Sequence, residues 1–236
     1  MAANFQKLYD RGSSLFEQGD PEAAVLFLRR ASETNPTSTT TLDLLAEVEM
    51  AIGEIERAQL CWNRGLELSG DPNSVENTER WLYIAQTQEG DAARASYEQG
   101  ISLLRKRLQS LKQLEGAEST GPSSLVNESS PEIVRAKLCT AHCALADLYL
   151  TDLCFEDGAE EKCQVILDAA MELNVAQSHE PLQSMASLRF SQGKPDEACQ
   201  VSWSTKFRIR ILSYQNRITL FMILISSDFF CLLNVV

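Results

Sequence analysis

Apolar and small residues in the first two hundred positions recur with the spacing of paired helices. The segment PEAAVLFLRRASETNP, residues 21–36, places small or apolar side chains at 24, 25, 28 and 31, the spacing of one helix face. Asn35 and Pro36 end this helix, because proline cannot continue a helix and disfavours helical geometry in the preceding residue. An apolar stripe over residues 5–16 predicts an earlier helix, and a Gly-Asp-Pro turn separates the two.

This unit of two helices joined by a tight turn repeats after 34 residues. Gly12 and Ala46 are small residues at this interval, and Leu28 and Trp62 are large apolar ones. Two helices cross closely only where a side chain is small, and the large residue fills the adjoining hollow. The first two units cover 5–38 and 39–72, and three later units with changed lengths begin near Trp81, Leu145 and Leu182.

These repeated residues resemble the tetratricopeptide repeat. The resemblance implies an all-α fold, a tetratricopeptide-repeat α-solenoid of about five helix pairs over residues 5–200. The second helix of the third unit is predicted to run well past normal length. The Gly-, Ser- and Pro-rich segment 116–131 follows it as a flexible loop. Residues 151–158 contain an insertion between the two helices of the fourth unit.

The repeat pattern breaks after Gln200, and residues 201–236 form a hydrophobic tail with four basic residues and one acid. Three hypotheses compete for this tail. Residues 218–236 have the length of a membrane anchor, although Asp228 near the middle of that stretch opposes insertion. The tail could also pack back on the array as a cap. The favoured hypothesis is that it is foreign to the native fold, for example a translated intron or a shifted reading frame.

The net negative charge of the chain excludes some classes of binding partner. The chain of 236 residues has 33 acidic and 21 basic side chains and a net charge of −12. Nucleic acid and anionic membranes repel such a chain, so we expect neither as a direct partner, and a basic protein is the natural complement. The seven cysteines are an odd number, and MAANFQKLYDRG lacks the apolar core of a secretion signal. These features predict reduced thiols and a compartment that is cytosolic or nuclear.

Candidate chemistry is sparse. Cys139 and Cys143 share a helix face, but a zinc site needs further converging ligands, so we interpret them as packing residues. No phosphate-binding glycine loop, dinucleotide fingerprint, nucleophile elbow or HExxH motif occurs. The sequence therefore predicts a binding protein that is not an enzyme, with no cofactor, metal or small-molecule substrate.

The repeat resemblance implies where a partner binds. In such solenoids the first helix of each pair lines a concave face that holds extended segments of other proteins. Of thirty positions carried over to that face, eight are acidic and none is Lys or Arg. A groove for a Lys/Arg-rich segment is therefore expected, with aromatic side chains stacking on its cations. The alternative is that an acidic protein simply has acidic faces. The predicted partner-binding residues are Tyr9, Asp10, Phe16, Glu17, Asp43, Glu47, Glu79, Tyr83, Glu89, Asp147, Glu180 and Phe190.

A closer resemblance lies in two longer runs. WLYIAQ at 81–86 precedes YEQGI at 97–101, and ADLYLTDLCFE at 146–156 precedes AEEKC at 159–163. These runs resemble the fungal family of assembly chaperones for large-subunit ribosomal protein four. The resemblance covers about residues 5–200 and implies a dedicated escort that shields this basic ribosomal protein on its way to the nucleus. It leaves open whether residues 151–156 touch the cargo or only brace the fourth unit.

Two other functional classes remain open at this stage. A general tetratricopeptide scaffold or adaptor for protein complexes would use the same array. A tail-anchored membrane receptor would need residues 218–236 to insert into a bilayer.

Overall fold

A computed structural model describes residues 2–115, 130–173 and 178–203. The chain divides into two compact units, Met1–Leu125 and Val126–Val236. The first unit contains α1 (Ala2–Glu17), α2 (Pro21–Thr34), α3 (Thr39–Ala51), α4 (Ile55–Leu68), the 3₁₀ helix η1 (Val75–Asn77), α5 (Thr78–Gln86) and α6 (Gly90–Glu115). The second contains α7 (Pro131–Leu150), α8 (Ala159–Leu173), α9 (Glu180–Ser191) and α10 (Pro195–Trp203). The described residues thus form five consecutive helix pairs, and the predicted all-α repeat fold is confirmed.

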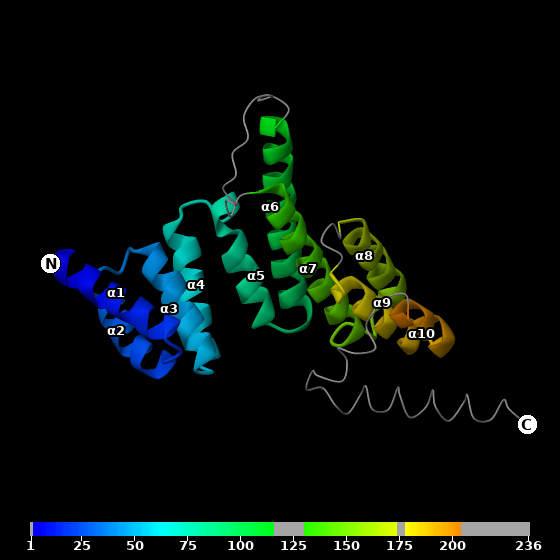
Figure 1. Cartoon of the computed structure of the whole chain (residues 1–236), viewed down its shortest axis with the longest axis horizontal. Coiled ribbons are helices and arrows are strands. Elements are labelled where there is room, and N and C mark those ends of the chain that lie inside the picture. The colour runs from blue at the N-terminus through cyan, green and yellow to red at the C-terminus, as the bar shows by residue number, and fades with distance from the viewer. Residues whose placement is uncertain (1, 116–129, 174–177, 204–236) are drawn as a thin grey trace, which may run out of the picture. The chain divides into compact units, whose positions relative to one another are not determined.

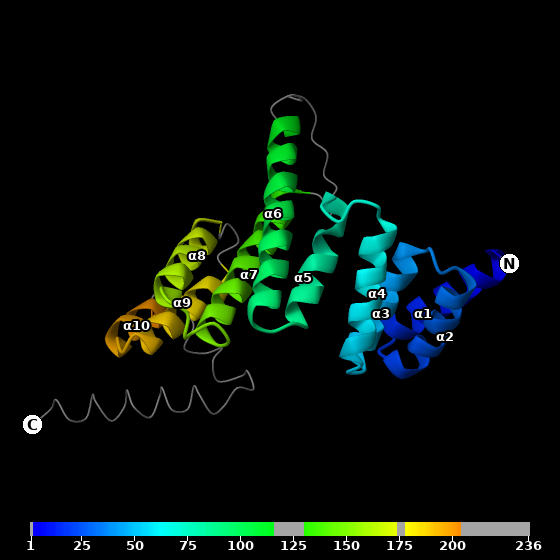
Figure 2. The same cartoon turned by 180° about the vertical axis from the view of Figure 1, so that it is seen from behind.

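In the first unit, α1 to α6 pack as three successive hairpins (Figure 1 and Figure 2). The second helix of each of the first two pairs also packs on the first helix of the next pair, α2 on α3 and α4 on α5. The turns within the first two hairpins use equivalent glycines, because Gly19 and Gly53 have φ of 80° and 83°, a region that disfavours side chains. Asp20 then caps α2 by accepting a hydrogen bond from the Ala23 amide at 3.0 Å, which satisfies one free N–H of the first turn.

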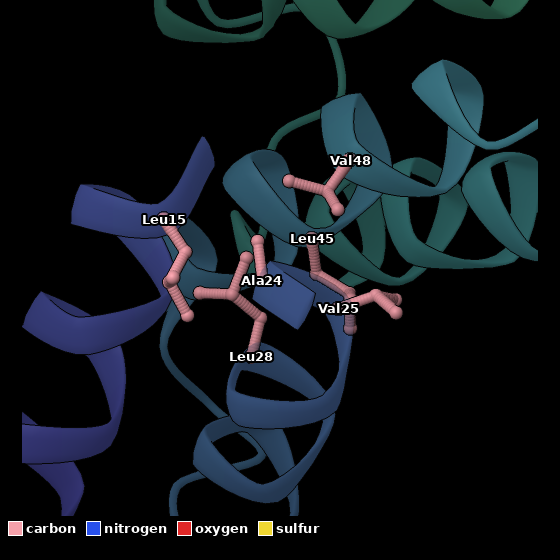
Figure 3. Close-up of a cluster of buried hydrophobic side chains, with 6 residues drawn as sticks. All are labelled: Leu15, Ala24, Val25, Leu28, Leu45 and Val48. Atoms are coloured by element: carbon pink, nitrogen blue, oxygen red, sulfur yellow. The ribbon is translucent and has the colours of Figure 1, made fainter. Parts of the chain in front are cut away.

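The repeated small and large residues build the core of the first unit. Figure 3 shows the side chains of Leu15, Ala24, Val25, Leu28, Leu45 and Val48, which come from α1, α2 and α3 and form one buried cluster. Gly12 is small because a Cβ atom there would lie 2.6 Å from Cγ of Leu28. Trp62, the counterpart of Leu28 one repeat later, is 1% exposed and anchors a second cluster with Ile84. The 34-residue interval predicted from sequence is therefore the interval of the core.

In the second unit, α7 packs on α8 and α9, and α9 packs on α10. Ser130 caps α7 by accepting a hydrogen bond from the amide of Ile133. The predicted insertion is the connection between α7 and α8; its Leu153 is buried, and the Leu153 amide donates to the Leu148 carbonyl of α7. This connection is therefore anchored to the helices on either side.

The helix boundaries refine two predictions. The second helix of the third pair, α6, runs for 26 residues, as its sequence predicted. The second helix of the fifth pair, α10, ends at Trp203, three residues into the segment where the repeat pattern is lost. Most of the predicted loop 116–131 and the tail from residue 204, including the proposed anchor at 218–236, lie outside the described residues. Among the helices that are described, none has the length and apolar character needed to span a membrane.

Candidate protein-binding faces

The first helices of the second and third pairs bring acidic side chains together. Asp43 and Glu47 lie one turn apart on α3, and Glu79 and Tyr83 lie one turn apart on α5. The charges of Asp43 and Glu79 act on the carboxyl group of Glu47, and all three carboxylates act on the Tyr83 hydroxyl. We call these four residues the first acidic face. Sequence reasoning placed all four among the partner-binding residues, and the structure brings them together.

Negative charge is crowded on the first acidic face. Partial burial raises the pKa of Glu47 above its usual value, and the charges of Asp43 and Glu79 raise it further. Partial burial also raises the pKa of Tyr83, and the surrounding carboxylates, Glu47 first, add to the effect. An arriving cation would relieve this repulsion, because each carboxylate gains an opposite charge in place of a like one.

Tyr83 is held in place by an aromatic neighbour. Its ring stacks on Trp62 with centroids 5.1 Å apart and an angle of 11° between the planes. Trp62 is fully buried, whereas Tyr83 is half-buried, so one face of the tyrosine packs on the core and part of it stays accessible. The first acidic face therefore carries an aromatic ring of fixed orientation beside its carboxylates.

One member of the face already has a cation. The Arg80 guanidinium donates to both carboxylate oxygens of Asp43, from Nε at 2.7 Å and from Nη2 at 2.6 Å. Arg80 also donates to Asn77, and its side chain is only 10% exposed. It crosses Gly65, where a Cβ atom would lie 2.7 Å from Arg80 Nε. None of the thirty face positions is Lys or Arg, yet Asp43 is paired, because Arg80 reaches it from a position outside that set. This ion pair ties α5 to α3 and occupies both carboxylate oxygens of Asp43, which leaves that carboxylate less available to a partner.

The second unit has an acidic pair on its own first helices. Asp147 lies on α7 and Glu180 begins α9, and the charge of Glu180 acts on Asp147. Burial of its carboxyl group raises the pKa of Asp147, and a hydrogen bond with Ser184 opposes this shift. Thr140 donates a hydrogen bond to Glu180 Oε2 at 2.8 Å. We call Asp147 and Glu180 the second acidic face.

The other predicted partner-binding residues are either exposed or partly buried in the fold. Tyr9 and Phe16 on α1 are half-buried and pack against the first core cluster, so each has less free surface than the sequence suggested. Asp10 and Glu17 are exposed on α1, where Asp10 accepts a hydrogen bond from Gln6 and Glu17 one from Ser13. Glu89 is exposed before α6, and Phe190 is 41% exposed near the end of α9.

The crowding at Glu47 predicts a pH-dependent stability effect. A carboxyl whose folded-state pKa is raised binds protons more readily in the folded chain than in the unfolded one, so stability falls as pH rises through that pKa. We expect Glu47→Gln to raise the denaturation midpoint at pH 7 and to leave it unchanged at pH 3.5, where Glu47 is protonated in both states. Urea unfolding at the two pH values measures this. Glu56→Gln, at an exposed carboxyl on α4, is the control and should show no gain, and an equal gain at both pH values for Glu47→Gln would contradict the prediction.

The cysteines considered as metal ligands are packing residues. Cys139 and Cys143 are buried, Cys139 Sγ donates to the Ala170 carbonyl at 3.4 Å, and burial raises the pKa of both thiols. Burial also raises the pKa of Cys163 to about 11. Such thiols stay protonated and are poor ligands and nucleophiles. In the part of the chain that the structure describes, no group of three or more His, Cys, Asp or Glu side chains is placed to hold a metal ion.

Sequence reasoning missed two features of these surfaces. Arg80 was overlooked because it sits one position away from the face residue Glu79. The available signal was that Arg80 is the one basic residue of that helix. Phe155, in the α7–α8 connection, is 97% exposed, and an aromatic residue inside an inserted segment was the signal for it.

Hairpins of paired helices repeated at 34 residues define the class: an all-α solenoid of the tetratricopeptide-repeat type. No protein-family model matches the chain. The chain is 25% identical over 199 residues to a probable assembly chaperone of rpl4 from Schizosaccharomyces pombe, covering 84% of this chain and 54% of that protein. A protein with the same description from Emericella nidulans is 25% identical over 203 residues, covering 82% of this chain and 46% of the relative. The chain thus spans about half the length of the curated relatives it matches.

Solved structures agree with this relationship. The assembly chaperone of RpL4, Acl4 (residues 1–338), superposes with a TM-score of 0.68 at 27% identity, covering 84% of this chain and 72% of that one. A MamA protein superposes with a TM-score of 0.57 at 15% identity over 91% of this chain and 97% of that one, which bears on the fold alone. The resemblance to the assembly chaperones of ribosomal protein four, expected from two sequence runs, is confirmed.

Proposed function

We propose that this chain is a chaperone that binds the basic ribosomal protein rpl4 and keeps it soluble before it joins the ribosome. The observation that carries the proposal is the similarity to two probable assembly chaperones of rpl4 and to the Acl4 structure, over more than four fifths of this chain. The chain acts by binding and not by catalysis. It binds its client in the cytoplasm and the nucleus, where the ribosomal protein is made and is assembled into the ribosome.

The two acidic faces supply the recognition chemistry. Glu47 and Glu79 in the first unit, and Asp147 and Glu180 in the second, are carboxylates crowded by like charge. Lysine and arginine side chains of the client pair with these carboxylates, and the accessible part of Tyr83 offers a stacking surface for a guanidinium group. Opposed charge speeds association and selects basic clients, while apolar contacts set the lifetime of the complex.

Co-expression tests the proposal. We expect rpl4 from the same organism to be largely insoluble when expressed alone and to be recovered in a soluble complex with the full-length chain. A second basic ribosomal protein is the control for specificity and should stay insoluble. Failure to solubilise rpl4 would refute the chaperone function. Equal solubilisation of both clients would refute a dedicated role and favour a general scaffold for basic proteins.

A further inference from the structure

The connection between α7 and α8 is held firmly by its own contacts. The amide of Leu153 donates to the Leu148 carbonyl at 3.0 Å, and the Leu153 side chain is 7% exposed. The amide of Glu156 donates to the Leu153 carbonyl at 3.0 Å, and its carboxylate accepts from Lys162 Nζ at 3.0 Å. Backbone turns, a buried leucine and an ion pair therefore fix the path of the chain on both sides of residue 155.

Phe155 projects from this fixed connection. Its side chain is 97% exposed, whereas the next most exposed large apolar residues of the described chain, Leu60 and Val165, are each 68% exposed. Leu153 already supplies the apolar anchor of the connection, so Phe155 contributes nothing to bracing the fourth helix pair. A large aromatic ring held in water by an ordered segment is the usual form of a binding anchor.

An apolar hollow lies next to the same connection. It has a volume of about 350 Å³ and is lined by Tyr149, Glu161, Lys162, Val165 and Ile166. Lys162 joins the hollow to the connection, because its ammonium group pairs with Glu156 and lies 5.7 Å from the centre of the Tyr149 ring. The connection and the hollow thus form one continuous surface of the second unit, with Phe155 as its projecting point. We call this the Phe155 surface.

The negative charge around Phe155 indicates that the partner of the Phe155 surface is basic. Residues 151–162 contain five acids, Asp152, Glu156, Asp157, Glu160 and Glu161, against one base, Lys162. A projecting ring beside a hollow would suit a second copy of this chain, but two such surfaces would bring ten carboxylates together. A basic partner gains from the same charges. An extended segment has no pocket for a projecting ring, so the partner is folded and presents an apolar pocket bordered by Lys or Arg.

We propose that the Phe155 surface binds the folded, basic body of the client. Phe155 enters an apolar pocket of the client, and the surrounding carboxylates pair with the basic residues at the rim of that pocket. This inference rests on the proposed function, since it takes rpl4 as the client. It also assigns the inserted connection to cargo binding, the alternative that the sequence left open.

The test uses the full-length chain and purified rpl4 in a calorimetric titration. Phe155→Ala should weaken binding about 10-fold or more, because truncating a central aromatic anchor has effects of that order. Leu60→Ala, at an exposed leucine on α4, is the matched control and should change affinity by less than about 2-fold. Phe155→Ala should also keep the wild-type thermal midpoint, because the ring makes no core contact, so reduced binding would not reflect misfolding.

A second probe separates this site from the acidic faces. A Lys/Arg-rich peptide of about 15 residues is extended and has no pocket, so its binding should be insensitive to Phe155→Ala and weakened by Glu47→Gln with Glu79→Gln. Unchanged rpl4 binding by Phe155→Ala would overturn the inference and leave the proposed function intact. Absence of rpl4 binding by the wild-type chain would overturn both. A wild-type dimer in sedimentation that Phe155→Ala dissolves would also overturn it, since the occupant would be a second copy.

Discussion

Replacing Glu47, Glu79 and Asp147 by lysine is expected to abolish the solubilisation of rpl4 and to weaken its binding by about 100-fold or more. Each substitution removes a carboxylate from a crowded face and puts a cation where the client presents its own cations. Attraction becomes repulsion at three places, in surroundings that partly exclude water and therefore screen charge less than bulk solvent does. Titration of purified rpl4 and the co-expression assay both measure the loss.

Asp43 is left out of this variant for a structural reason. Its carboxylate is paired with Arg80, so a change there would break an internal ion pair and confuse lost binding with lost stability. The matched control reverses three exposed carboxylates on the second helices, Glu56, Glu98 and Glu172, and changes the net charge by the same amount. We expect this control to retain at least most of the wild-type affinity. Equal losses in the two triple variants would show that only the net charge of the chain matters, and the acidic faces would then have no special role.

Removing the Arg80 side chain is expected to destabilise the first unit by about 3 kcal/mol. Arg80→Ala leaves Asp43 and Asn77 without their shared donor and opens a space over Gly65. The loss is large because the arginine is almost fully enclosed and the pair joins helices from neighbouring repeats, whose interfaces stabilise the array. Urea unfolding followed by tryptophan fluorescence measures it, since Trp62 and Trp81 lie in this unit.

Two further variants sharpen this prediction. Arg80→Lys should recover only part of the loss, because an ammonium group does not reproduce the two parallel hydrogen bonds of a guanidinium. Arg64→Ala is the matched control, since Arg64 pairs with Glu67 in an exposed position and the pair is worth about 0.5 kcal/mol or less. An Arg80→Ala protein as stable as the Arg64→Ala protein would show that the pair with Asp43 contributes nothing to the fold.

The Arg80–Asp43 pair also changes how the acidic faces are understood. Counting residues by their position in the repeat treated every carboxylate on a first helix as available to a partner. The structure divides them into a carboxylate used by the fold, Asp43, and carboxylates that crowd one another, such as Glu47 and Glu79. A similar division occurs at Glu49 on the same helix, which is 2% exposed and bound by Arg29 through two hydrogen bonds of 2.8 Å. Carboxylates that repel one another without a compensating cation destabilise the folded state. Such destabilising charge clusters are typical of binding surfaces.

The sequence by itself determined the paired helices and their order. Helix periodicity, the Asn-Pro and Gly-Asp-Pro stops and the 34-residue interval of Gly12 with Ala46 are local signals, because a helix and its ends depend on residues within a few positions. The interval between small residues also located the inserted connection before α8. The loss of the repeat pattern after Gln200 stays a prediction about the tail; α10 itself ends at Trp203.

Only the tertiary structure decided which charges and rings are available. Asp43 and Arg80 are 37 residues apart, and their meeting depends on the rotation and spacing of α3 and α5, which no local pattern encodes. The same holds for the half-buried state of Tyr9 and Phe16, the stacking of Tyr83 on Trp62, and the full exposure of Phe155 beside the buried Leu153. Helix formation is governed by neighbours in sequence, whereas burial and ion pairing are governed by neighbours in space, and packing alone creates those.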